Sequence, residues 1–311
     1  MHGSKRIVSL LASATEILAC LGLLEQIKAV SHECDYPAEV ADKPKVTRSR
    51  LSKSLSSQAI DDAVRQQLAA GQSLYQLDEE EICRIEPDLI VTQAQCDVCA
   101  VEYQAVMALV ESHSSLAETT VLALNPSTLD EILEDIVRVG QVVGRVDESK
   151  RLVASLRERM KAIQVKLAGQ PRVRVACIEW TEPIMLAGNW IPDLISMAGG
   201  QSQLAEAGVH STYGSWQDVV ELDPEVIVVA PCGFDLQRSQ QEAEALPAWD
   251  HWDQLSAVRD DRVFVIDGNA LLNRSGPRVV ETIEVLAHLF HPQHVAPPEG
   301  DSRQGIAWDL L

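Results

Sequence analysis

Residues 126–169 read PSTLDEILEDIVRVGQVVGRVDESKRLVASLRERMKAIQVKLAG. Ser127 or Thr128 can cap a first helix, because a hydroxyl oxygen is favoured at the helix N-cap. A second helix start at Asp147 opens a longer segment with apolar residues at helical spacing and no glycine before Leu167. About twenty helical residues with a rise of about 1.5 Å each form a rod of roughly 30 Å. Such a rod is long enough to connect two domains.

The sequence on either side of this rod repeats one pattern. Before it, an acidic helical run ends at Pro87-Asp88 and leads into the apolar residues 89–91. After it, a second helical run ends at Pro224-Glu225 and leads into the apolar residues 226–229. Helix, proline–acid pair and buried strand thus occur in both halves. We predict an α/β fold with two Rossmann-like lobes joined by a long rigid helix and a ligand cleft between the lobes.

The domain organisation follows from these segments. A chain of 311 residues is long enough for two domains with separate cores. We expect an N-terminal α/β lobe at 1–125, a helical spacer at 126–169 and a C-terminal α/β lobe at 170–291. The remaining residues, 292–311, contain proline and glycine and are expected to form a loosely ordered tail.

Charge and hydropathy exclude several partners and suggest a location. The formal net charge of −20 argues against nucleic acid or an anionic membrane surface as a partner. No apolar run reaches the roughly 18 residues that a membrane-spanning helix needs. No apolar run of about 7–15 residues follows Lys5-Arg6, as a signal peptide would require. We therefore expect a cytoplasmic protein, or a periplasmic one if a signal peptide has been removed.

Four of the seven cysteines follow predicted strands and form a candidate metal site with a nearby histidine. The candidate ligands are Cys34, Cys96, Cys99, Cys232 and His32. Thiolates bind zinc and other soft metals, and tetrahedral zinc needs about four ligands. The single CxxC motif at 96–99 is a weak zinc signal by itself. Small residues in tight turns explain the same pattern equally well, so both interpretations stay open.

Aromatic and polar residues also fall at predicted strand ends and in loops. The candidate ligand-binding residues are Tyr36, Tyr75, Trp180, Trp216, Phe234, Asn273 and Arg274. Ligands of open α/β sheets bind beyond the carboxyl ends of the strands, and aromatic faces can bury a large flat ligand. The chain has no phosphate-binding glycine loop and no nucleophile elbow. No nucleophile–base pair can be named, and we do not predict an enzyme.

Several motifs together resemble the substrate-binding proteins of ABC importers. They are Arg6–Leu10, Ala14–Leu18, Cys34–Pro37, Pro87–Val91, Ala198–Gly200, Pro224–Val228 and Arg274–Arg278. The resemblance covers about residues 6–290 and is strongest to the cobalamin- and iron-chelate-binding class, which has a helical backbone between its lobes. It implies a rigid two-lobed protein that binds a large ligand between the lobes.

The resemblance also implies roles for individual residues. Tyr36 would line the cleft, and Arg274 would contact the ligand. Family members have an acidic residue four positions before that arginine, whereas this chain has Ala270 at that position. Family members dock to their importer through one glutamate in each lobe. Glu80 matches the first, within an acidic run that is also typical of a solvated surface. The second position is Gln217, which departs from the family pattern.

Three functional hypotheses follow. The first is a binding protein for a large metal chelate, cobalamin or another corrinoid, with an ABC importer as a partner through Glu80. The second is a cytosolic redox protein that binds zinc, another metal or a cluster through its cysteines. The third, an enzyme on the same scaffold, ranks last.

Overall fold

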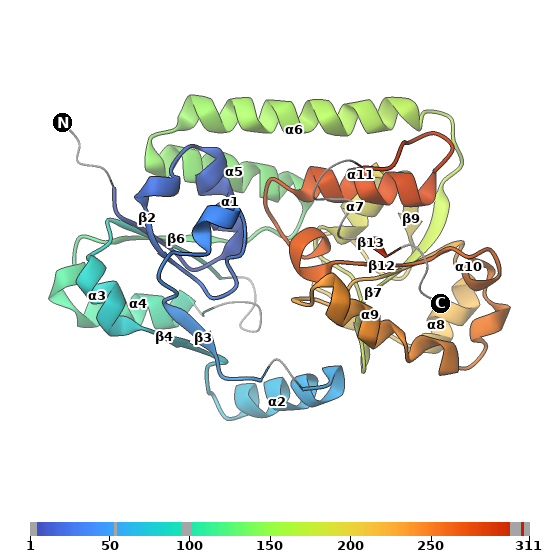
Figure 1. The fold of residues 1–311 in the computed structure, drawn as a ribbon, viewed down its shortest axis with the longest axis horizontal. Coiled ribbons are helices and arrows are strands. Elements are labelled where there is room, and N and C mark those ends of the chain that lie inside the picture. The colour runs from blue at the N-terminus through green and yellow to red at the C-terminus, as the bar shows by residue number, and fades with distance from the viewer. Residues whose placement is uncertain (1–4, 53–54, 95–100, 102, 299–305, 308–311) are drawn as a thin grey trace. The chain divides into compact units, whose positions relative to one another are not determined.

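The structure is a computed structural model that describes residues 5–52, 55–94, 101, 103–298 and 306–307 (Figure 1). The chain divides into two compact units. Unit 1 comprises Met1–Pro126 and Leu133–Val153, and unit 2 comprises Ser127–Ile132 and Ala154–Leu311. Each unit is an α/β lobe with parallel strands at its centre, which confirms the predicted fold class. The ligand cleft predicted between the lobes stays a prediction.

Unit 1 contains a parallel four-stranded sheet in the order β2-β1-β5-β6. Its strands are β1 (Ile7–Ser9), β2 (Ile27–Val30), β5 (Leu89–Gln93) and β6 (Thr120–Leu124). Its helices are α1 (Ala12–Cys20), α3 (Glu79–Ile85) and α4 (Tyr103–Ser112), with 3-10 turns at Leu24–Gln26, Ala38–Val40 and Ser114–Leu116. Val8 and Ile90 lie opposite each other on β1 and β5 and pack with Val106 of α4 in the core. The strands are apolar because they are covered on both faces.

A two-stranded hairpin also belongs to unit 1. Strands β3 (Thr47–Ser49) and β4 (Tyr75–Leu77) pair antiparallel, and the amphipathic helix α2 (Ser57–Ala69) lies between them in sequence (Figure 1). The acidic helical run predicted before Pro87 is α3, which begins at Glu79. Leu77 belongs to β4, and the side chain of Asp78 caps α3 by accepting the backbone N–H of Glu81 at 3.1 Å.

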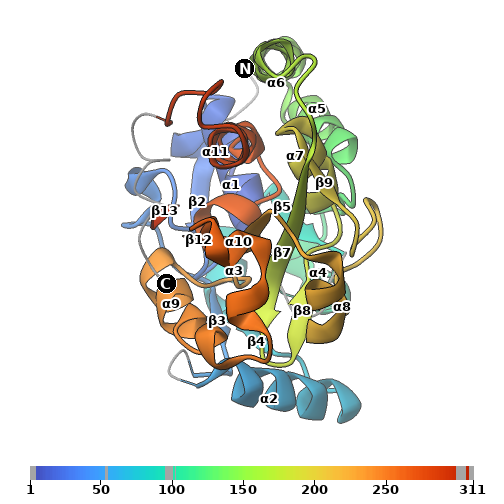
Figure 2. The same ribbon diagram turned by 90° about the vertical axis from the view of Figure 1, so that its right-hand side faces the viewer.

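Unit 2 is built on a sheet in the order β10-β8-β7-β11-β12-β13, with β9 parallel to β7 (Figure 2). The strands are β7 (Val173–Thr181), β8 (Ile184–Leu186), β9 (Gly200–Ser202), β10 (Thr212–Tyr213), β11 (Val226–Val229), β12 (Val263–Ile266) and β13 (Ile306–Ala307). The helices are α7 (Ile191–Met197), α8 (Trp216–Leu222), α9 (Leu236–Ala243), α10 (Ser256–Arg259) and α11 (Val279–Phe290). Short turns lie at Leu246–Ala248 and Trp252–Gln254, and a π-helical turn lies at Gly268–Leu272. Strand β13 lies in the segment 292–311, which was expected to form a loosely ordered tail, and it pairs antiparallel with β12.

The helical segment that the sequence set apart as a spacer is divided between the two units. It forms α5 (Leu129–Val143) and α6 (Val146–Lys166). Thr128 is the residue that caps α5: its hydroxyl accepts the backbone N–H of Glu131 at 3.3 Å, and the Glu131 carboxylate accepts the N–H of Thr128 at 3.2 Å. This reciprocal pair is a capping box. No helix in the described ranges is long and apolar enough to cross a membrane.

The pattern repeated in the sequence has the same geometry in both units. Helices α3 and α8 end at Glu86 and Asp223, whose φ angles of 46° and 45° are left-handed, and a proline follows each. The next residue, Asp88 or Glu225, accepts the backbone N–H of an arginine at 2.6 and 2.9 Å, respectively. The carboxylate ties the helix–strand junction to a neighbouring strand, so the proline–acid pair is structural in each unit.

Candidate functional site

In unit 2, two aromatic rings meet at the carboxyl ends of parallel strands. Trp180 lies near the end of β7 and Phe234 follows β11, with ring centroids 5.0 Å apart and planes tilted by 44°. The guanidinium of Arg238 lies 5.0 Å from the centre of the Phe234 ring. Both rings are partly exposed. We call Trp180, Phe234 and Arg238 the aromatic platform; it lies where ligands of open α/β sheets bind.

A buried hydrogen-bond network holds the residue that precedes Trp180 on β7. Glu179 precedes Trp180 on β7 and is only 8% exposed. Its carboxyl group accepts the hydroxyl of Ser211, and that hydroxyl oxygen accepts the N–H of Gly188 at 2.9 Å. Burial raises the pKa of Glu179, with the Ser211 hydrogen bond opposing the shift. Glu179 could not be singled out from the sequence, because one carboxylate among 46 acidic residues gives no signal.

In unit 1, His32 and Tyr75 lie together with ring centroids 5.6 Å apart. The Nδ1 atom of His32 lies 2.6 Å from the Thr47 hydroxyl oxygen, and its Nε2 atom lies 2.9 Å from a carboxylate oxygen of Glu33. Both ring nitrogens therefore lie close to oxygen atoms of neighbouring side chains. Tyr36 is 37% exposed and so accessible to a ligand.

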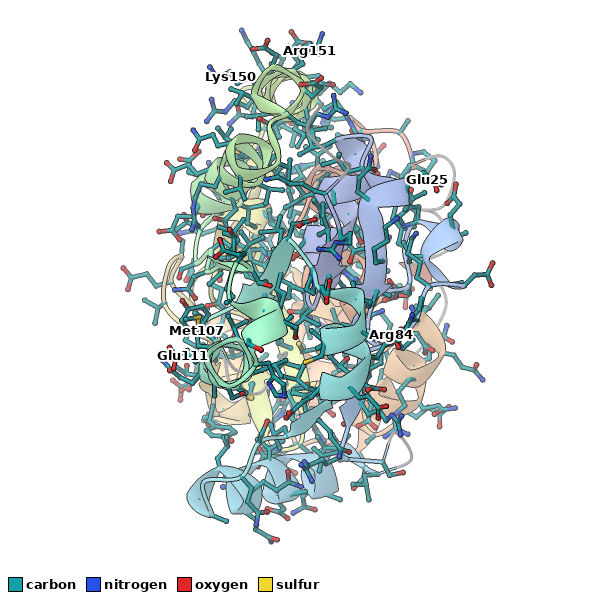
Figure 3. All side chains as sticks on the ribbon, turned by 90° about the vertical axis from the view of Figure 1, so that its left-hand side faces the viewer. Glu25, Arg84, Met107, Glu111, Lys150 and Arg151 are labelled. Carbon is teal, nitrogen blue, oxygen red and sulfur yellow. The ribbon has the colours of Figure 1, made fainter. Side chains whose placement is uncertain are left out.

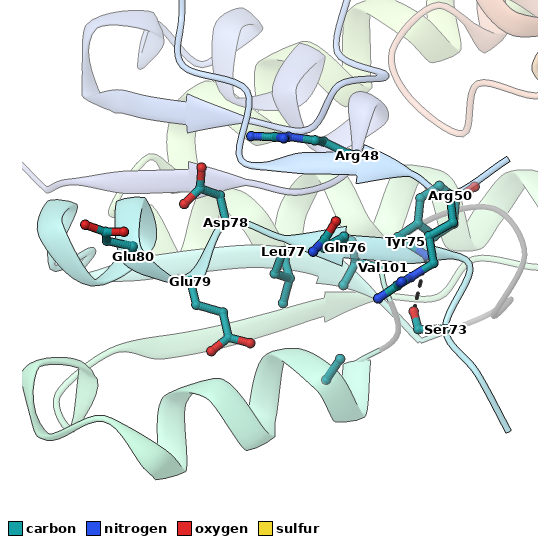
Figure 4. Close-up of a pocket in the computed structure, with 11 residues that line it drawn as sticks. Arg48, Arg50, Ser73, Tyr75, Gln76, Leu77, Asp78, Glu79, Glu80 and Val101 are labelled. Carbon is teal, nitrogen blue, oxygen red and sulfur yellow. Dashed lines mark hydrogen bonds between the residues drawn. The ribbon is translucent and has the colours of Figure 1, made fainter. Parts of the chain in front are cut away.

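Tyr75 also lines a pocket of about 570 Å³ that lies wholly within unit 1 (Figure 4). The lining residues come from the hairpin β3–β4 and its flanking residues, the start of α3, Val101 and the first turn of α4. They are Arg48, Arg50, Ser73, Tyr75, Gln76, Leu77, Asp78, Glu79, Glu80, Val101 and Ala105.

The predicted metal site does not form within the described residues. Cys34 is buried in unit 1, with its sulfur 3.1 Å from the Thr15 hydroxyl oxygen, and it fills the core. Cys232 lies after β11 and is partly buried. Cys96 and Cys99 lie outside the described residues. The described part of the chain contains no group of three or more His, Cys, Asp or Glu side chains that could hold a metal ion. The metal or cluster hypothesis is therefore unsupported.

The remaining candidates in unit 2 make internal contacts. Arg274 is 3% exposed and donates to the backbone oxygen and the side-chain oxygen of Asn269 at 3.1 and 3.0 Å. Asn273 donates to the Ala230 carbonyl at 3.3 Å. Trp216 packs edge-on against Trp249 with centroids 4.7 Å apart. Contacts of Arg274, Asn273 and Trp216 with a ligand stay predictions.

Comparison with known proteins decides the family. A family model described as periplasmic binding protein matches residues 7–270. The chain belongs to the periplasmic binding protein family. The relatives and solved structures agree with this membership, which confirms the resemblance found in the sequence.

Two curated relatives and one solved structure illustrate the match. The uncharacterized ABC transporter substrate-binding lipoprotein YvrC of Bacillus subtilis (strain 168) is 25% identical, over 93% of this chain and 80% of its own length. The vitamin B12-binding protein of Vibrio cholerae is 23% identical, over 90% of this chain and 87% of its own length. The periplasmic heme-binding protein RhuT of Roseiflexus sp. RS-1 superposes with a TM-score of 0.70 at 22% identity, covering 93% of this chain and 99% of RhuT.

Membership of this periplasmic binding protein family has two consequences. Such proteins bind substrates for ABC importers and are not enzymes. The predicted cytoplasmic location is wrong, because the family is periplasmic and one relative is named a lipoprotein. The error has a physical cause: a signal peptide is separate from the folded lobes, so the sequence of the lobes does not specify the compartment in which they function.

Proposed function

We propose that this periplasmic binding protein binds a corrinoid, cobalamin or a close analogue, and delivers it to an ABC importer. The sequence relative named a vitamin B12-binding protein supports the ligand class, since the match extends over most of both chains. The proposal is finer than the family assignment, which includes proteins for several large ligands.

The aromatic platform is the observation that carries this proposal. Trp180 and Phe234 present partly exposed apolar faces at the carboxyl edge of the unit 2 sheet. A corrin ring is broad and nearly flat, with apolar methyl groups and polar amides on its rim. Aromatic faces bury the apolar part, and Arg238 beside Phe234 supplies a donor for a rim amide oxygen.

We also propose that the start of α3 contacts the importer. Glu80 is exposed and lies two residues after the capping residue Asp78. Gln217 lies two residues after the capping residue Ser215 of α8, and it too is exposed. The two positions thus correspond in the two units. Glu80 supplies a charge for a basic surface of the importer, whereas Gln217 supplies only hydrogen bonds.

A visible absorption spectrum tests the ligand class. The full chain is produced in a host fed with cyanocobalamin, purified without denaturation, and compared with the same chain from an unfed host. The proposal predicts corrinoid absorption bands at about one ligand per chain only in the first sample. A colourless protein that also takes up no added cyanocobalamin, or one that carries heme instead, contradicts it.

A further inference from the structure

The guanidinium group of Arg238 in the aromatic platform forms an ion pair within its own helix. Its Nη2 atom donates to one carboxylate oxygen of Glu242 at 2.5 Å, one turn further along α9. The other carboxylate oxygen of Glu242 accepts the hydroxyl of Thr181 at 3.1 Å. Thr181 follows Trp180 on β7. Glu242 therefore connects the strand that carries Trp180 to the helix that carries Arg238.

This ion pair is largely shielded from solvent on its acidic side. The side chains of Glu242 and Arg238 are 12% and 26% exposed, and Thr181 is 5% exposed. A charged hydrogen bond at such a site is short, and salt screens it less than a pair on the open surface. Because the cation and the anion are in contact, the pair acts on a ligand as a dipole and adds no net charge to the platform.

The residues next to the two aromatic rings are acidic. Glu182 lies in the turn after β7, and Asp235 is the N-cap residue of α9; both are exposed. The side chain of Asp235 accepts the backbone N–H of Arg238 at 2.8 Å. With the charge of Arg238 balanced by Glu242, the formal charge of this group of residues is negative. A ligand carboxylate beside the platform is repelled, whereas an uncharged amide in the same place is not.

We propose that Glu242 is a positioning residue that sets the charge selectivity of unit 2. By balancing the charge of Arg238, it makes the platform select a ligand with an uncharged rim over the same ligand with an ionised carboxylate. This inference rests on the proposed function, since the rim of a corrin ring carries amides. Glu242 acts through Arg238 and needs no contact of its own with the ligand.

The test compares two ligands that differ by one charge. Cyanocobalamin is titrated into the full chain in parallel with its separated monocarboxylates, in each of which one rim amide has been hydrolysed, at neutral pH and constant ionic strength. The measured quantity is the ratio of dissociation constants, monocarboxylate over cyanocobalamin. This ratio is expected to exceed one for wild type. A merely structural role of Glu242 would weaken both ligands alike and leave the ratio unchanged.

Substitutions of the pair are expected to move this ratio in opposite directions. Glu242→Gln leaves the charge of Arg238 unbalanced and is expected to lower the ratio by about tenfold for at least one monocarboxylate. That is the effect of a unit charge about 6 Å away at an effective dielectric constant of roughly 40. Arg238→Gln is expected to raise the ratio, and the double variant to return it close to the wild-type value. The matched control, Glu111→Gln, removes an exposed carboxylate of α4 in unit 1 and is expected to leave the ratio unchanged (Figure 3).

The outcomes separate this inference from the proposed function. Equal ratios in folded wild type, Glu242→Gln and Arg238→Gln, or a wild-type preference for the monocarboxylates, overturn the inference. If Glu242→Gln does not fold, a ratio that fails to rise in Arg238→Gln overturns it. If wild type binds no corrinoid, the proposed function fails, and the same variants are titrated with hemin and its uncharged dimethyl ester. Binding of neither of these, or a ratio that does not change among the variants, overturns the role of Glu242.

Discussion

Trp180 is the residue on which the proposed ligand contact depends most. Its indole N–H already donates to the Glu182 carbonyl at 3.1 Å, so the side chain is held in place before a ligand arrives. Trp180→Ala is expected to weaken corrinoid binding by about 1–3 kcal/mol, the value of burying a large apolar side chain. Fluorescence titration with cyanocobalamin measures the change.

The control is Trp249→Ala in the same unit. Trp249 packs edge-on against Trp216 and contributes to the core of unit 2 instead of the platform. The Trp249→Ala variant is expected to have a lower melting temperature, with a dissociation constant for cyanocobalamin within about twofold of wild type. If Trp180→Ala also leaves that constant unchanged, Trp180 is a structural residue.

Glu179 gives a prediction about pH. Burial raises its pKa in the folded protein, so the neutral acid is favoured there. Its stabilising contribution is fully present below the unfolded pKa and is lost as pH rises through the raised folded pKa. His210 and Cys177 are the titratable neighbours.

The test is Glu179→Gln, which keeps an oxygen for the Ser211 hydroxyl and cannot ionise. The melting temperature of the variant relative to wild type is expected to increase as pH is raised from acidic to mildly alkaline values. A difference that stays constant with pH, or falls, contradicts a buried carboxyl group at this position.

At the scale of single elements, two neighbouring hydroxyl residues at the start of α5 have different roles. The sequence allowed Ser127 or Thr128 as the cap, and the structure shows Thr128 accepting the Glu131 N–H. Thr128→Ala is expected to lower the free energy of unfolding by about 1 kcal/mol. Ser127→Ala, the matched control, is expected to change it little; urea unfolding curves measure both. The reverse order of effects would contradict the assigned cap.

The elements that sequence patterns predicted best are apolar and buried. The buried strand predicted at residues 226–229 is β11, whose residues are all buried, because burial on both faces makes the apolar run visible in the sequence. The hairpin strands β3 and β4 were missed, because Thr47–Ser49 has no apolar alternation and pairs only with β4.

The candidate site was harder to predict than the fold. The aromatic residues Trp180 and Phe234 do meet at strand ends, as the sheet rule requires. Arg274 and Cys34 also follow predicted strands, yet both are buried and make internal contacts. A position in the sequence specifies the end of a strand, whereas the direction of a side chain depends on packing partners that are distant in sequence.

At the scale of the whole molecule, α6 belongs to both units, with the division at Val153 and Ala154. The helix has no glycine or proline, so we expect one continuous hydrogen-bonded rod. Amide hydrogen exchange near this division is expected to be as slow as in the helical turns of α6 on either side of it. Gly144, with a φ of 73° between α5 and α6, marks a break and is expected to exchange faster. Fast exchange confined to residues 152–156 would indicate a hinge.

The most direct measurement of the central claim is an equilibrium titration of the purified full chain with cyanocobalamin, with hemin titrated in parallel. The account predicts saturable cobalamin binding at one ligand per chain and a clearly weaker response to hemin. Tighter or exclusive binding of hemin, or no saturable cobalamin binding by a protein that is folded by circular dichroism, would contradict the account.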